Sequence, residues 1–357
     1  MKIIGIDLGK FKSVACASPA AGVEPTFRTL PTDPQAFHDY LVEQAPDRLA
    51  IEVGTPAGWV FDLATDLGIP CEVANTRDER FSYIKTRKKT DRDDALKLVR
   101  LSRLDEMPEV TLPSRETRQH KQLIRHRETL VGRRTAIVNH IRSLFDQQGI
   151  RLPAGQKLWS KAGRAVLAEH ARELTQGLPM HEAWRGILHE ELAAWHQLHE
   201  RIKAVEARLK AAHAACPKCK RLQTIPGVGP RLSESLVTVL GDPNRFKSGK
   251  EVSAYVGMTP RLHQSGEVLR SGRISKQGDR RLRSLLVEIA WACRRFNPTF
   301  KALFEHLTGG QKTRRKKAAV ALGRRILVVC WSMLKHERDW DASKVGPPSL
   351  GAAVSAV

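Results

Sequence analysis

Apolar, often β-branched residues form short runs separated by polar turns in the first part of the chain. These runs predict strands at residues 2–7, 13–18, 25–30, 49–53 and 71–74. Segments between and after them predict helices near 33–44 and 59–67 and a helix that starts at Thr90. The resulting order of strands and helices is typical of a mixed sheet with helices packed on it. We assign residues 1–112 to one α/β domain.

A seven-residue apolar repeat marks the middle of the chain. It runs through two segments, 114–148 and 184–212, that both predict long helices. The repeat comprises Leu123, Leu130, Ile137 and Leu144 in the first segment and Leu188, Trp195, Ile202 and Leu209 in the second. This spacing favours coiled-coil packing, either within one chain or between two copies. We assign residues 113–215 to a helical coiled-coil segment.

The last part of the chain predicts a mainly helical domain over residues 216–340. Its apolar helix 231–240 follows the turn Pro226-Gly227-Val228-Gly229, which resembles a helix-hairpin-helix. Glycines there would let backbone N–H groups approach a phosphate, although a tight interhelical turn needs glycine too. Further helices are predicted at 279–294 and 318–334, and a disordered tail rich in Ser, Gly, Pro and Ala at 341–357.

The charge balance indicates a polyanionic partner. The 357 residues carry a formal net charge of +22, and the sequence pI is about 10.1. A hydrophobic fraction of 41% excludes a basic disordered chain. Nucleic acid is the partner that best matches this surplus. The predicted nucleic-acid contacts are Lys10, Lys12, Arg87, Lys88, Lys89, Gly227, Gly229, Arg261, Arg270, Arg273, Lys276 and Arg280.

The chain shows no pattern of export or membrane insertion. Residues 1–7 read as a strand without the apolar core of a signal peptide, and no apolar run approaches a membrane span. The six cysteines lie mostly in apolar segments, as reduced thiols do, so cytoplasmic residence is expected. Cys216 and Cys219 form one CxxC, for which a helix-end turn through Pro217 is favoured over a zinc site.

Four carboxylates stand where a charge needs a partner. Asp7 ends the first predicted strand, and Glu52 lies in the fourth. Asp91 and Asp94 are three residues apart and therefore share a face of the helix after Thr90. Such carboxylates suit Mg²⁺ or Mn²⁺, and two ions can hold the attacking and leaving oxygens of a phosphodiester. The alternatives are ion pairs in the strands and favourable charges at a helix start.

Asp93 has a structural role in this interpretation. Thr90 and Asp93 fit a capping box, in which each side chain binds the backbone N–H of the other residue. Asp93 points away from the face that carries Asp91 and Asp94, so we expect it to stabilise the helix start.

Ser265-Gly266 lies in a polar, hairpin-like loop with cations on both sides. A serine hydroxyl becomes a nucleophile when a base or a positive field stabilises its alkoxide, and neighbouring guanidinium groups supply such a field. From chemistry alone a simple turn is the commoner explanation. Ser275 is the second candidate, although Ser275-Lys276-x-Gly278 better suits phosphate positioning at a helix start.

These residues carry a resemblance to a known family. Asp7, Glu52 and the run Thr90-Asp91-x-x-Asp94-Ala95 resemble the tetrad of a RuvC-like, RNase H-fold nuclease domain, and the set is similar to that of the insertion-sequence one-ten family of bacterial transposases, also called bridge-RNA-guided recombinases. The resemblance continues through Arg127–Val131, Asn139–Ile141 and Tyr255–Asp279. The chain departs from the family where Leu8-Gly9-Lys10 replaces a loop with serine and Val53-Gly54-Thr55 replaces Ala-Thr-Gly.

The resemblance spans residues 1 to about 335 and implies a DNA recombinase. It implies that Asp7, Glu52, Asp91 and Asp94 bind Mg²⁺ and that Ser265 is a covalent nucleophile. It further implies donor and target DNA, a guide RNA from the same element, and other copies of the protein in a dimer or tetramer as partners.

Three other functions compete with this one. A hydrolytic RuvC-like nuclease, such as a junction resolvase, would use the same carboxylates without Ser265. An actin-like kinase or ATPase would need a second predicted hairpin that carries Asp-x-Gly, and no such hairpin is predicted. A DNA-binding protein without activity leaves the four acidic positions unexplained, because they would repel the phosphates.

Overall fold

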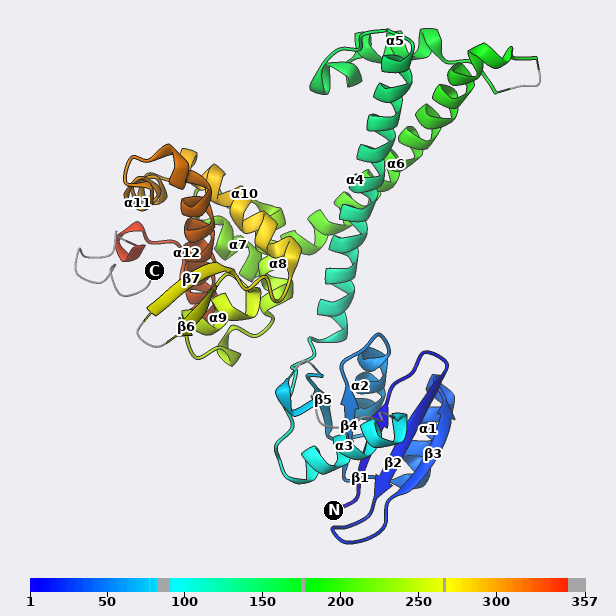
Figure 1. Ribbon diagram of the computed structural model, residues 1–357, viewed down its shortest axis with the longest axis vertical. Coiled ribbons are helices and arrows are strands. Elements are labelled where there is room, and N and C mark those ends of the chain that lie inside the picture. The colour runs from blue at the N-terminus through cyan, green and yellow to red at the C-terminus, as the bar shows by residue number, and fades with distance from the viewer. Residues whose placement is uncertain (77, 82–89, 175–176, 266–267, 346–357) are drawn as a thin grey trace. The chain divides into compact units, whose positions relative to one another are not determined.

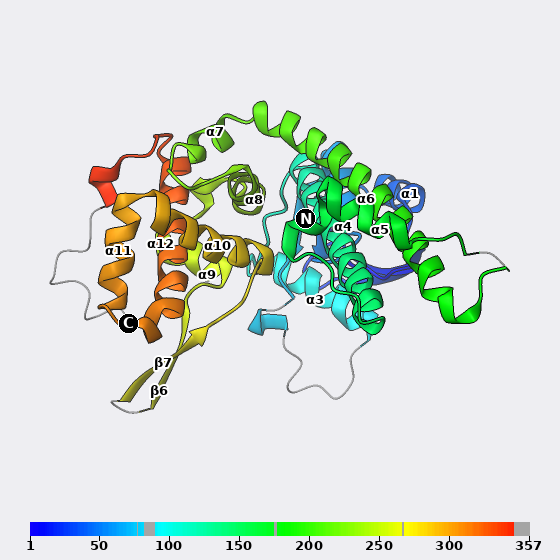
Figure 2. The same ribbon diagram turned by 90° about the horizontal axis from the view of Figure 1, so that it is seen from above.

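The computed structural model describes residues 1–76, 78–81, 90–174, 177–265 and 268–345. The chain forms two compact units, residues 1–116 and 117–357, and each is described by itself (Figure 1, Figure 2). A mixed sheet with helices is followed by a mainly helical region, so the predicted fold class is confirmed. No helix in the described part of the chain combines the length and apolar character needed to cross a membrane.

The first unit is built on a five-stranded sheet in the order β3-β2-β1-β4-β5. The strands are β1 (Ile3–Asp7), β2 (Lys12–Ser18), β3 (Thr26–Pro31), β4 (Arg48–Glu52) and β5 (Cys71–Ala74). β1, β2 and β3 pair antiparallel, whereas β4 pairs parallel with both β1 and β5. All five predicted strands are confirmed, each to within one residue at either end.

Helices cover both faces of this sheet. α1 (Pro34–Gln44) and α2 (Ala57–Asp66) pack on one face, and α3 (Asp91–Arg103) packs on the other. Because successive strand residues point to opposite faces, Ile4 and Ile6 join the core under α1 and α2 while Ile3 packs against α3. Burial on both faces explains why the first strand reads as a continuous apolar run.

Gly5 lets α3 approach β1 closely. Its position faces α3, and a Cβ there would overlap the carbonyl oxygen of Ala95 and lie 2.9 Å from Cγ2 of Val99. Ala95 and Val99 are themselves fully or almost fully buried. The close approach of helix and strand at this point therefore requires glycine.

Gly5→Ala should lower the free energy of unfolding by about 1–3 kcal/mol, the usual cost of overpacking a core. Gly54→Ala is the matched control, because the nearest atom to a Cβ there is Cδ of Pro56 at an ordinary 3.7 Å. Denaturant unfolding of both variants measures the effect. An equal loss in the two variants would mean that the contact between α3 and β1 does not depend on glycine.

In the second unit, α4 (Arg115–Gln147) and α6 (Ala183–Ala214) form a helical hairpin within the chain. Leu130 of α4 is buried against Leu198 and Ile202 of α6. Side chains also cross between the helices, from Arg127 to Glu206 at 2.8 Å and from His140 to Glu191 at 2.8 Å. The seven-residue repeat thus packs inside one chain, which is one of the two arrangements left open by the sequence.

The segment that joins these helices is more ordered than the sequence indicated. It contains α5 (Lys161–His170), an element that the seven-residue repeat of the flanking helices did not predict. Leu158 and Leu167 of this segment are buried with Phe145 of α4 and Leu188 of α6. The few apolar residues of α5 are buried only by contact with the two long helices. The periodicity of the α5 segment alone therefore did not predict this helix.

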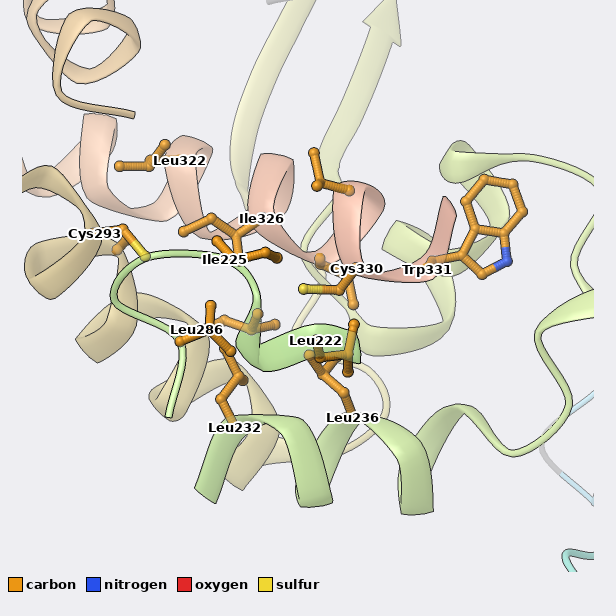
Figure 3. Close-up of a cluster of buried hydrophobic side chains, with 14 of the residues drawn as sticks. Leu222, Ile225, Leu232, Leu236, Leu286, Cys293, Leu322, Ile326, Cys330 and Trp331 are labelled. Atoms are coloured by element: carbon orange, nitrogen blue, oxygen red, sulfur yellow. The ribbon is translucent and has the colours of Figure 1, made fainter. Parts of the chain in front are cut away.

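The C-terminal part of the second unit has one continuous core, part of which Figure 3 shows. Its helices are α7 (Pro217–Gln223), α8 (Pro230–Leu240), α9 (Gly249–Val256), α10 (Arg280–Phe296), α11 (Pro298–Thr308) and α12 (Arg315–Lys335). Ile326 and Cys330 of α12 face Ile225 and Leu286 from other elements (Figure 3). Nε1 of the buried Trp331 donates to the Pro243 carbonyl at 2.9 Å. The strands β6 (Pro260–Ser265) and β7 (Val268–Ile274) form a separate two-stranded sheet.

The predicted disordered tail needs a correction at its start. Residues 342–345 form a short 3-10 turn, and Val345 is 5% exposed because it packs into the core of the C-terminal helices. Residues 346–357 lie outside the described residues. The predicted division at residues 112, 215 and 340 stays a prediction.

Candidate functional site

The parallel pairing of β1 with β4 brings two predicted carboxylates to one edge of the sheet. Ile6 pairs with Ile51, so Asp7 and Glu52, the last residues of these adjacent strands, lie at the same end of the sheet. Both side chains are half-buried. The register thus places together two residues that are far apart in the chain.

The start of α3 supplies the other two carboxylates. Thr90 is its N-cap, as predicted, and the Thr90 hydroxyl oxygen accepts the backbone N–H of Asp93 at 3.2 Å. The Asp93 carboxylate accepts the Thr90 hydroxyl at 2.7 Å, where a capping box would have it bind the Thr90 N–H. Asp93 therefore stabilises the helix start in a slightly different way from the one predicted.

Asp94 lies close to Asp7 because α3 is pressed against β1. Asp94 directly precedes Ala95, the residue whose carbonyl meets Gly5. Burial raises the pKa of Asp94, and the charge of Asp7 raises this pKa further, while Lys97 lowers it. The two carboxylates thus repel each other. Asp91, one helical turn earlier, is exposed.

The donor set at this edge fits a divalent cation in kind. Carboxylate oxygens are the ligands that Mg²⁺ and Mn²⁺ prefer, and a cation between Asp7 and Asp94 would relieve their repulsion. Asp7, Glu52 and Asp94 already have polar or electrostatic partners in the fold. Within the described residues, no three His, Cys, Asp or Glu side chains are grouped as metal ligands. Metal binding would therefore require these side chains to move toward one another.

Ser265 is the last residue of β6 and pairs with Val268 of β7. The predicted hairpin-like loop is thus a β-hairpin whose tip follows Ser265. Gly266 lies outside the described residues, as does the side chain of Ser265. The hairpin has a bulge near its base, between Pro260 and Leu262.

Ser275 is held away from the surface. Its backbone N–H donates to the Thr259 carbonyl at 2.8 Å, and its hydroxyl is buried without a hydrogen-bond partner. A nucleophile must reach a bulky phosphodiester, so this burial favours Ser265 over Ser275. Lys276 and Gly278, which follow, have positive φ values of 59° and 72°. At Gly278 a Cβ would overlap the Tyr255 carbonyl, so this turn packs tightly on α9.

The helix start after this turn is already occupied by a carboxylate. Asp279 is the N-cap of α10, and its carboxylate accepts the N–H groups of Arg281 and Leu282 at 2.9 and 3.0 Å. Lys121 and Arg125 of α4 lie 3.6 Å from the same carboxylate. Although burial raises the pKa of Asp279, these N–H groups and cations hold the pKa below its usual value. This helix start is thus a poorer candidate for positioning a phosphate than the sequence predicted, because two of its N–H groups already donate to Asp279.

The predicted nucleic-acid contacts fall into two groups. Lys10, Lys12, Arg261, Arg273, Lys276 and Arg280 have exposed side chains. Arg87, Lys88 and Lys89 lie outside the described residues, as does the side chain of Arg270. Exposed cations are available to DNA phosphates, which take most of the hydrogen bonds in protein–DNA interfaces.

The two glycines of the Pro-Gly-Val-Gly turn differ. Gly227 has a φ of 97°, and a Cβ there would lie 3.0 Å from Sγ of Cys293 on α10. Its glycine is thus explained by the turn and by packing. Gly229 precedes α8, and no atom lies within 4 Å of the place where its Cβ would be. Of the two, Gly229 is therefore the better candidate for approach to a phosphate.

The CxxC motif starts a helix. Cys216 is the N-cap of α7, which begins at Pro217, and Sγ of Cys216 accepts the Cys219 N–H at 3.3 Å. This geometry agrees with the helix-end turn favoured by the sequence. Cys219 is buried, and burial is also the main cause that raises its pKa.

Two features of the site escaped the sequence argument. One is Gly5, whose contact with α3 brings Asp94 to Asp7. The other is the set of ion pairs between α4 and the start of α10, which includes Arg281 with Glu128 at 2.7 Å. A lone glycine inside a predicted strand was a usable signal of close backbone approach. Nothing in the sequence marked the ion pairs, because their partners are about 150 residues apart along the chain.

Comparisons with known proteins match both the region of the carboxylates and the region of Ser265. Residues 4–149 match a family model described as Transposase, and residues 219–305 match one described as Transposase IS116/IS110/IS902 family. The chain is 28% identical to the transposase for insertion sequence element IS1111A of Coxiella burnetii, over 95% of this chain and 91% of that one. It is also 28% identical to the transposase for insertion sequence element IS1328 of Yersinia enterocolitica, over 70% and 72% of the two chains.

A solved structure of RuvC from Thermus thermophilus is also similar to this chain, with 14% identity and a TM-score of 0.22. The match covers 31% of this chain and 100% of the RuvC chain. The two family models match the carboxylate region and the serine hairpin in the order that the sequence predicted. The chain belongs to the IS110 family of transposases, which are DNA-cleaving enzymes.

Proposed function

We propose that this transposase cuts and rejoins donor and target DNA with two sets of residues. Asp7, Glu52, Asp91 and Asp94 hold Mg²⁺ or Mn²⁺, and Ser265 attacks the DNA backbone. The observation that carries the proposal is the convergence of Asp7 and Asp94: burial raises the pKa of Asp94, and the charge of the nearby Asp7 raises this pKa further. A bound divalent ion supplies charge stabilisation for the scissile phosphate.

The elements that carry Asp7, Glu52 and Asp94 support the proposal. Asp7 and Glu52 end paired strands of a buried sheet, so their backbones cannot shift independently. Asp94 is carried by a helix whose start is held by Thr90 and which packs on Gly5 from Ala95 onward. Rigid elements hold charged groups more accurately than loops do, which is what a phosphate-cleaving site needs.

Ser265 provides the chemistry that allows rejoining. Its Oγ gives up the hydroxyl proton and forms a bond to phosphorus while the bond from phosphorus to one deoxyribose oxygen breaks, and that oxygen takes up a proton in exchange. The phosphodiester energy is kept in the serine ester, so a new strand end can reverse the step. Arg261 and Arg273 of the same hairpin are exposed and can bind the phosphate charge.

A hydrolytic nuclease of the junction-resolvase kind is the alternative. It would use the carboxylate edge alone and would leave no covalent intermediate between protein and DNA. The position of Ser265 next to the tip of a basic hairpin favours the recombinase.

We further propose that the protein acts in the bacterial cytoplasm as a dimer or tetramer with a guide RNA. If so, the purified protein should carry a discrete RNA, and nuclease treatment should abolish cleavage of a plasmid that holds the element ends. Adding back the RNA should restore cleavage. Cleavage that survives removal of all RNA would contradict RNA guidance and leave the transposase assignment intact. The formal net charge of +22 is compatible with two nucleic-acid partners.

A further inference from the structure

A large aromatic side chain stands unburied next to the carboxylate edge. Phe11 lies in the turn between β1 and β2, and its side chain is 75% exposed. By comparison, Phe37 in the core below the same sheet is fully buried. Single exposed apolar residues are common on protein surfaces, so the surroundings of Phe11 decide whether it has a role.

The backbone holds Phe11 in place. Its carbonyl accepts the Thr32 N–H at 2.9 Å, and the hydroxyls of Ser13 and Thr32 lie 2.8 Å apart. The turn is tight, because a Cβ at Gly9 would overlap the Lys12 carbonyl. The backbone therefore fixes the place of the ring, although the ring gains no stabilisation from burial.

A cation lies over the ring, and a second one is its neighbour in sequence. Lys10 and Lys12 flank it in sequence and are both exposed, and Nζ of Lys10 lies 4.9 Å from the ring centroid. An aromatic face among cations is the combination that binds unpaired nucleobases, since the ring stacks on the base while the cations bind the backbone. Neither a core role nor a purely electrostatic role for the loop requires phenylalanine at this position.

The ring is within reach of the carboxylate edge. Asp7 pairs with Val14, and Phe11 is three residues beyond Val14 toward the tip of the hairpin. Three residues of extended chain span about 10 Å. That distance equals about three nucleotides of stacked strand, at about 3.4 Å each.

We propose that Phe11 stacks on a nucleobase of the DNA strand that the carboxylate edge cleaves. By holding a base a few nucleotides away, the ring sets which phosphate reaches Asp7 and Asp94. This inference rests on the proposed function of that edge. It adds a DNA-binding residue that neither charge nor carboxylate chemistry identified.

The test uses the full-length protein with any bound RNA and a synthetic DNA that carries 2-aminopurine at successive positions, both single-stranded and as a duplex. Binding should quench 2-aminopurine at one or two positions through stacking. Phe11→Ala should remove this quenching and weaken binding by about 5- to 150-fold, the range for loss of one base–aromatic stack. Phe11→Trp should keep both. Leu104→Ala is the matched control, because Leu104 is 66% exposed but lies at the opposite end of α3 from Asp94.

A second readout identifies the contact directly. With 5-iodouracil at the quenched position, irradiation should crosslink the DNA to Phe11, as mapped by mass spectrometry. The inference is wrong if Phe11→Ala keeps the quenching and the affinity, or if it changes only the oligomeric state. Failure of the proposed function is seen separately: if Asp94→Asn still cleaves DNA, the carboxylate site fails whatever Phe11 does. If Asp94→Asn abolishes cleavage but Phe11→Ala leaves its rate and position unchanged, only the inference about Phe11 fails.

Discussion

Asp94→Asn should reduce DNA cleavage by about 10²- to 10³-fold, as expected when one charged group of a preorganised site is lost. The metal-free variant should nevertheless be at least as stable as the original protein. Burial and the neighbouring Asp7 raise the pKa of Asp94, so the folded chain holds this proton more tightly than the unfolded chain. Stability therefore falls as the pH rises from the ordinary pKa of aspartate through the raised one. An uncharged Asn removes that cost at neutral pH.

Cleavage assays in Mg²⁺ and denaturant unfolding in a chelator measure the two effects separately. Asp93→Ala is the control on the same helix, because it removes the bond to the Thr90 hydroxyl and should lower stability while cleavage persists. Cleavage by the original protein should also weaken on acidification through the raised Asp94 pKa, since a metal ligand must be deprotonated. Full activity of Asp94→Asn would contradict the metal site. Loss of cleavage in Asp93→Ala without loss of stability would instead contradict the structural role of Asp93 at the helix start.

Ser265→Ala should eliminate the covalent protein–DNA adduct and reduce strand rejoining by at least about 10³-fold, since a nucleophile acts as a unit with its site. The adduct is detected as protein that migrates with DNA in denaturing gels, and its residue is identified by mass spectrometry. Binding affinity should stay close to that of the original protein, because the exposed cations Arg261 and Arg273 remain.

Ser275→Ala is the matched control for this experiment. The Ser275 hydroxyl is buried and its N–H is bonded to Thr259, so its loss should leave the adduct intact. An adduct that persists in Ser265→Ala and maps to Ser275 would move the nucleophile. If neither residue forms an adduct and DNA is still cut, the hydrolytic alternative holds.

Local patterns determined most of the secondary structure. Apolar runs ended by polar turns predicted every strand of the main sheet, and Thr90 marked the first residue before α3, because a threonine side chain can satisfy the free N–H groups of a helix start. Heptad spacing predicted α4 and α6, because apolar side chains seven residues apart lie on one face. The same local signals missed α5 and misjudged residues 342–345, whose apolar side chains are stabilised only by distant parts of the fold.

The residues of the site could be predicted from the sequence, but their proximity in the fold could not. Asp7 and Glu52 stood out as charges in predicted strands, and Asp94 shared a helix face with Asp91. Resemblance to a family gave them a role. That Asp7 adjoins Glu52 depends on the parallel register of Ile6 with Ile51. That Asp94 reaches Asp7 depends on the missing side chain at Gly5. Both are contacts between residues far apart in the chain, and only packing of the whole sheet and helix decides them, because a local pattern sets a residue's face but not its distant neighbour.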